Sequence, residues 1–132
     1  MILMITGSRK ANRASDRVAL KKAILKHAPN CQLLIHGGAK GADTLAEEIA
    51  KELGIETKIV RPNYNKYHYK AAPLKRNSEM VNEATKVIAY YHTSKTGGTL
   101  DAAKKAAKQN KLVAEYVNGK EVKPPAQQMS LL

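Results

Sequence analysis

Five short apolar runs recur along this chain of 132 residues, and their recurrence limits the folds open to it more than any other feature. Apolar residues at consecutive positions are expected where helices cover both faces of a parallel sheet. Each run is about as long as a strand and rich in Ile, Val, Leu or Tyr. Five strands are therefore predicted, at residues 1–6, 32–36, 57–61, 86–91 and 111–116.

The segments between these runs place apolar residues at helical spacing. The first predicted helix is capped by Ser15 and ends before Pro29, and the second is closed by Gly54 as a C-cap. The third contains Leu74 and the fourth Leu100. This alternation predicts an α/β fold with a Rossmann-like, doubly wound and mainly parallel five-stranded sheet and helices on both faces.

The composition changes after Val117. A chain of 14.5 kDa is most simply one domain, and residues 1–117 contain all the predicted elements. Residues 118–132 are polar and contain two adjacent prolines, so they are predicted to form a flexible C-terminal tail.

Cysteine usage and charge limit the compartment and the partners. The single cysteine, Cys31, excludes an internal disulfide, and the four histidines lack metal-ligand spacing. The apolar start is too short for a signal peptide or a membrane span. We therefore expect a cytoplasmic protein with no metal, no cofactor and no membrane partner. A net charge of +12 suggests an anionic partner, although lysines on solvated faces explain it equally well.

Two glycine-rich turns follow predicted strands, "HGGAKGAD" at residues 36–43 and "SKTGGT" at residues 94–99. A helix N-terminus attracts phosphate, and glycine allows an anion to approach the backbone. One such turn is explained equally well by tight packing, but two at one sheet edge favour a phosphate or nucleotide site. With the neighbouring loops, the predicted ligand-binding residues are Gly7, Ser8, Arg9, Gly37, Gly38, Lys40, Gly41, Asp43, Tyr64, Arg76, Ser94, Gly97, Gly98 and Thr99.

Some residues of these loops have a structural explanation as well as a functional one. Asp43 could bind ribose hydroxyls, or it could only favour the first turn of its helix. His36 and His92 end predicted strands beside the loops, and we expect structural roles for both. No Ser, His and Asp arrangement can be assigned, so a hydrolytic triad is not predicted.

A basic segment with three tyrosines follows the third predicted strand. Its sequence, "RPNYNKYHYKAAPLKR", carries five Lys or Arg residues and no acid. Tyrosines between cations can stack on bases, or they can wedge a loop onto the core. Binding of single-stranded nucleic acid is therefore an alternative function.

Four motifs together resemble the SLOG superfamily, which includes the lonely-guy phosphoribohydrolases and the DprA proteins, and within it the YspA-like branch. They are "ITGSR", "HGGAKGAD", "PLKRNSEM" and "SKTGGTLDAA", and the resemblance covers about the first 115 residues. It implies nucleotide binding, with Asn77 added to the site, and hydrolysis of an N-glycosidic bond. Arg76 matches the functional arginine, and the functional glutamate falls on Ala102, next to Asp101. Arg76 and Asp101 are therefore the catalytic candidates.

The C-terminal pentapeptide resembles the bacterial sliding-clamp-binding motif. Two apolar residues at a free chain end can dock in a groove of another protein, although an inert tail is the alternative. The resemblance implies a replication-associated protein. The sequence does not fix the oligomeric state, so a homo-oligomer stays open. Its partner-binding residues would be Gln128, Met129, Ser130, Leu131 and Leu132.

Overall fold

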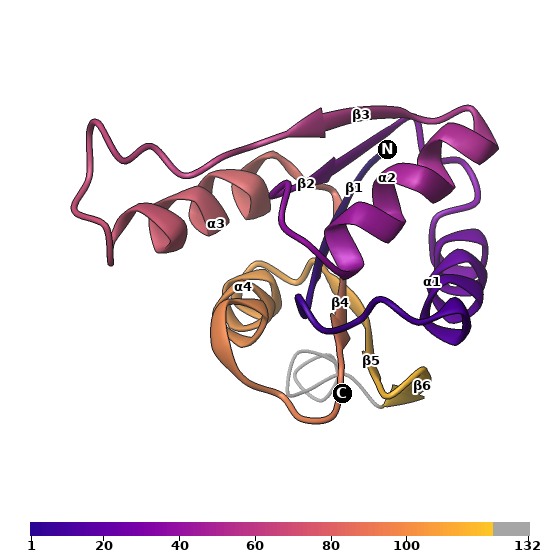
Figure 1. The fold of residues 1–132 in the computed structure, drawn as a ribbon. Coiled ribbons are helices and arrows are strands. Elements are labelled where there is room, and N and C mark those ends of the chain that lie inside the picture. The colour runs from indigo at the N-terminus through magenta and orange to yellow at the C-terminus, as the bar shows by residue number, and fades with distance from the viewer. Residues whose placement is uncertain (123–132) are drawn as a thin grey trace.

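The computed structural model describes residues 1–122, in which strands and helices alternate (Figure 1). The predicted α/β class with a Rossmann-like sheet is confirmed. In chain order the elements are β1 (Ile2–Gly7), α1 (Ala14–His27), β2 (Leu33–His36), α2 (Ala42–Leu53), β3 (Glu56–Ile59), α3 (Ala72–Glu83), β4 (Lys86–Tyr91), α4 (Gly97–Lys108), β5 (Leu112–Val117) and β6 (Lys120–Val122).

The sheet has six strands in the order β3-β2-β1-β4-β5-β6. The first five are parallel, and β6 is antiparallel to β5. From β1 the chain builds outward through β2 and β3, and then crosses back to lay β4 against the other side of β1. The carboxyl ends of β1 and β4 thus form the switch point at which sheets of this kind bind ligands.

The sixth strand corrects two sequence-based predictions, the strand count and the start of the tail. Residues 118–122 form a turn and β6 instead of belonging to a flexible segment. Asn118 and Gly119 both have positive φ, 52° and 78°, which is the backbone of a tight hairpin turn. The Asn-Gly pair is therefore a hairpin signal, which the assignment of residues 118–132 to a polar tail overlooked.

Both faces of the sheet are covered by helices, as predicted. One core lies under α1 and α2 and includes Leu3 and Ile5 of β1. The other lies under α3 and α4 and includes Met4 of the same strand. Successive side chains of a strand point to opposite faces, so β1 contributes to both cores and is buried from each side. Within residues 1–122, no helix is both long enough and apolar enough to span a membrane.

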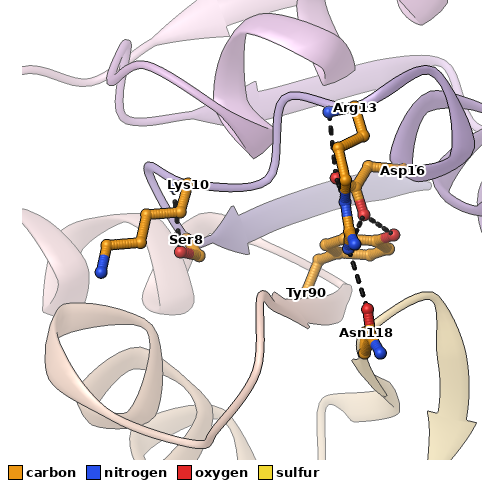
Figure 2. A network of polar contacts seen from close by, with 6 residues as sticks. All are labelled: Ser8, Lys10, Arg13, Asp16, Tyr90 and Asn118. Atoms are coloured by element: carbon orange, nitrogen blue, oxygen red, sulfur yellow. Dashed lines mark hydrogen bonds and ion pairs between the residues drawn. The ribbon is translucent and has the colours of Figure 1, made fainter.

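An ionic network around the buried Asp16 fixes the start of α1 (Figure 2). The Asp16 carboxylate accepts hydrogen bonds from the backbone N–H and the side chain of Arg13 and from the Tyr90 hydroxyl, at 2.8–3.0 Å. Arg13 also donates to Asn118 Oδ1 at 2.9 Å. Helix α1 thus begins at Ala14 with Arg13 as its N-cap, and the predicted Ser15 cap is wrong. The network ties the segment after β1 to β4 and to the β5–β6 turn.

Burial raises the pKa of Asp16, but the hydrogen bonds from Arg13 and Tyr90 outweigh this effect, and the net pKa is lowered. Asp16 therefore remains an ionised anchor although it is fully buried. The loop between β1 and α1, which includes Ser8 and Lys10, is held at its far end by this anchor (Figure 2).

Candidate functional site

A pocket of about 500 Å³ lies at the switch point between β1 and β4. The loops after β1, β2 and β4 line it together with the first half of α3. Its lining includes most of the predicted ligand-binding residues: Gly7, Ser8, Arg9, Gly37, Asp43, Arg76, Asn77, Ser94, Gly97, Gly98 and Thr99. Sequence reasoning omitted other residues of these loops from the candidate site, among them Lys10 and Thr93, although their position after a strand was a usable signal.

The other candidate residues lie elsewhere. Gly38, Lys40, Gly41 and Tyr64 do not line this pocket, and neither does Asp101. The proposed partner-binding residues, Gln128 to Leu132, lie outside the described part of the chain, so clamp binding stays a prediction.

The glycines of the loop after β2 serve different purposes. Gly41 has φ 77° and ψ −126°, a conformation that favours glycine. A Cβ atom there would overlap the carbonyl oxygens of Ser8 and Arg9. The Ala42 N–H also donates to the Ser8 carbonyl at 3.1 Å. Gly41 therefore allows the loops after β1 and β2 to pack against each other.

Gly37 makes room for Arg76. A Cβ atom on Gly37 would overlap the Arg76 guanidinium and come within 3.2 Å of Asp43 Oδ2. Arg76 Nη1 donates to the carbonyl oxygens of Gly37 at 3.1 Å and Val60 at 3.3 Å, and its Nε donates to Asn77 at 3.1 Å. These bonds hold the guanidinium against the backbone at the pocket wall.

Arg76 keeps unused capacity for an anion. Within residues 1–122 it forms no salt bridge, and its Nη2 has no hydrogen-bond partner. Burial lowers its pKa, Asp43 and Tyr64 act in the opposite direction, and Arg9 lowers it further. An arginine nevertheless stays charged in proteins, so the pocket holds a partly buried positive charge without a directly paired carboxylate.

The N-terminus of α4 opens onto the same pocket. Its N-cap, Thr96, makes no side-chain capping bond, and the first turn begins with Gly97 and Gly98. The first N–H groups of a helix have no partner within the helix, and they carry a partial positive charge. A Cβ atom on Gly98 would meet only Asn77 Nδ2, at 4.0 Å, so packing does not require a glycine there. Its small size leaves the backbone accessible from the pocket.

Asn77 holds the beginning of α4 in place. It is 4% exposed, and its Nδ2 donates to the Gly98 carbonyl and to Asp101 Oδ2, each at 3.2 Å. Asp101 also pairs with Lys105 at 2.9 Å. The neighbouring Ala102 is fully buried in the core. A side chain at position 102 therefore points into the protein core, away from the solvent.

Asp43 is the acidic residue that lines the pocket. It is 6% exposed, and its Oδ2 accepts the N–H groups of Gly37 and Ala39, each at 3.2 Å. Its Oδ1 is buried without a partner among the described residues. Burial raises the pKa of Asp43 above its usual value, and the Ala39 N–H and the charges of His36 and Arg76 offset only part of this effect.

The two histidines at strand ends differ in their environment. His36 has the expected structural role, because its Nε2 contacts Glu47 Oε1 at 2.7 Å and its Nδ1 accepts the Gly38 N–H at 3.0 Å. His92 instead lines the pocket, and its Nδ1 is buried without a partner among the described residues. Within residues 1–122, no group of His, Cys, Asp and Glu side chains could hold a metal ion.

Comparison with known proteins finds one similar phage protein. The gene 61 protein of Mycobacterium phage D29 is 31% identical over 113 residues, which cover 80% of this chain and 88% of that protein. No protein-family model and no solved structure matches the chain.

Proposed function

The chain belongs to the family of the gene 61 protein of Mycobacterium phage D29, and we propose that it binds the phosphate of a nucleotide or nucleotide-derived ligand in the pocket between β1 and β4. One observation carries this proposal. The partly buried Arg76, which has no salt-bridge partner in residues 1–122, lines the same pocket as the uncapped first turn of α4. A phosphate would satisfy both positive groups at once.

Other groups at the pocket support binding of an anion. Arg9 and Lys10 are exposed at its edge, and neither forms an ion pair in the described part of the chain. Ser8, Ser94 and Thr96 supply hydroxyls among the lining residues. A hydrogen bond to a charged phosphate is about twice as strong as one between neutral groups, so the phosphate would contribute much of the affinity.

The resemblance to the SLOG superfamily supports a nucleotide rather than free phosphate. Cleavage of an N-glycosidic bond, the reaction of the lonely-guy enzymes, develops positive charge on the sugar that a nearby carboxylate can stabilise. Asp43 lines the pocket, whereas Asp101 does not and is engaged by Asn77 and Lys105. Within this narrower proposal of hydrolysis, the carboxylate role therefore goes to Asp43.

Calorimetric titration with adenosine monophosphate and with adenosine tests phosphate recognition. We expect the monophosphate to bind at least about tenfold more tightly, because only it reaches Arg76 and the N-terminus of α4. Excess inorganic phosphate should compete with the nucleotide, and chromatography of the same samples would detect release of adenine. Equal affinity for nucleotide and nucleoside would contradict the proposal.

The segment between β3 and α3 supports a second function, binding of single-stranded nucleic acid. It extends away from the body of the protein (Figure 1), and residues 57–78 contain no acid. Tyr64 and Tyr69 are 60% and 64% exposed, and Lys70 Nζ lies 5.8 Å from the Tyr69 ring. Exposed rings beside cations suit a strand, because bases stack on rings while phosphates contact lysines.

Fluorescence anisotropy with a labelled thymidine oligonucleotide tests this second function. Changing Tyr64 and Tyr69 together to serine is expected to weaken binding about tenfold or more, because each base loses a stacking surface. A matched change of Lys104 and Lys108 to alanine, on the outer side of α4, should have a small effect. Equal binding of duplex DNA, or no effect of the tyrosine changes, would exclude this function.

A further inference from the structure

We infer that the pocket selects nucleotides with an intact ribose, and that the unpartnered Oδ1 of Asp43 accepts a hydrogen bond from a ribose hydroxyl. This inference rests on the proposed function, because it requires the phosphate to occupy the place described for it. It adds a specificity that phosphate binding does not demand, since arginine and helix N–H groups do not distinguish a ribose from a deoxyribose.

The evidence begins with an unsatisfied buried atom. Asp43 Oδ1 and His92 Nδ1 are the buried side-chain atoms without a hydrogen-bond partner in the described part of the chain, and both residues line this pocket. A buried polar atom without a partner is costly, and native proteins contain few of them. That both lie at one pocket indicates a ligand with polar groups that would satisfy them.

The loop after β2 fixes the orientation of the Asp43 carboxylate. Both loop N–H groups, from Gly37 and Ala39, donate to the same oxygen, Oδ2. The other oxygen, Oδ1, is therefore held in place and remains free to accept. Because the restraint acts through backbone groups of the loop, the orientation of the carboxylate does not depend on a mobile side chain.

The position of Asp43 relative to Arg76 identifies which part of a nucleotide it would meet. Arg76 Nη1 and Asp43 Oδ2 approach Gly37 at the same point, where a Cβ atom would contact both. A phosphate on Arg76 would therefore lie beside Asp43. Phosphate oxygens are repelled by a carboxylate, whereas a hydroxyl donates to it. In a nucleotide the hydroxyls next to the phosphate are those of the ribose, and the amino groups of the base lie beyond the sugar.

The substitution Asp43→Asn tests this inference with little structural change. The amide oxygen can keep the position of Oδ2 and its two N–H bonds, while the amino group replaces Oδ1 and turns an acceptor into a donor. Titration calorimetry of the full-length protein would compare adenosine monophosphate with its 2′,3′-dideoxy analogue. Circular dichroism would confirm that the variant is folded.

We expect the wild-type protein to bind the ribonucleotide about tenfold or more tightly than the dideoxy analogue, and Asp43→Asn to remove this difference. Glu48→Gln makes the same chemical change at an exposed position of the same helix and should preserve the difference. Equal binding of both nucleotides by the wild type would overturn the inference while leaving phosphate recognition intact.

Two further outcomes also decide the question. If the wild-type protein binds neither the ribonucleotide nor the dideoxy analogue, the proposed function is refuted, and the inference with it. Inosine monophosphate, which lacks the amino group of adenine, completes the comparison. If its affinity falls as far as expected for the dideoxy analogue while the dideoxy analogue binds normally, Asp43 meets the base, and the inference is wrong.

Discussion

The substitution Arg76→Ala is expected to weaken binding of a nucleoside monophosphate by about 100-fold or more. It removes the partly buried charge that would pair with the phosphate, and only the N-terminus of α4 and the exposed Arg9 and Lys10 would remain. Titration calorimetry measures the loss. Because Arg76 also donates to Gly37 and Val60, circular dichroism must show that the variant is folded.

Two variants serve as controls for Arg76→Ala. Arg17→Ala removes an arginine that pairs with Glu52 at 2.9 Å on the surface, so affinity should not change. Arg76→Lys keeps the positive charge, but it loses the planar guanidinium, which can bond the backbone through Nη1 while Nη2 binds an anion. The affinity of this variant should therefore be intermediate. A folded Arg76→Ala protein that binds within about twofold of the wild type would refute the proposed phosphate site.

The substitution Gly41→Ala is expected to lower the free energy of unfolding by at least about 3 kcal/mol. Two effects add together. Alanine is strained at the φ of 77°, and its Cβ atom would overlap the backbone of Ser8 and Arg9, which cannot rotate away as a side chain would. Urea unfolding followed by circular dichroism measures the change.

Gly98→Ala is the matched control for Gly41→Ala. Gly98 lies in the first turn of α4 with open space around it, so alanine should leave stability unchanged or raise it slightly. The same variant should weaken nucleotide binding, because the added methyl group crowds the first turn of α4. If Gly41→Ala unfolds at the wild-type urea concentration, the packing role assigned to Gly41 is incorrect.

Much of the candidate site was predictable because of the parallel sheet. Loops that follow parallel strands meet at one edge, so glycine loops far apart in the sequence, such as those containing Gly37 and Gly98, could be assigned to one pocket. The contacts that each glycine of a loop makes could not be predicted. Gly37 and Gly41 have the same residue type in the same turn, yet one faces Arg76 and the other faces the backbone after β1.

The acidic residues illustrate the same limit. Asp43 lies in the first turn of α2 and Asp101 in the second turn of α4, and both helices follow a glycine turn, but these positions do not show which carboxylate faces the pocket. In the structure Asp43 lines the pocket with an unpartnered oxygen, whereas Asp101 is held by Asn77 and Lys105. Asn77 lies on α3, so the side chain that engages Asp101 comes from a different part of the sequence.

The sequence by itself determined the alternation of strands and helices, the two-sided covering of the sheet and the edge at which a ligand would bind. These properties follow from local periodicity and from the rules that connect parallel strands. Only the tertiary structure decided which side chains face the pocket, because contacts such as those of Arg76 with Gly37 join residues 39 positions apart. The sixth strand likewise depends on a partner, since a three-residue strand such as β6 is stable only when paired with β5.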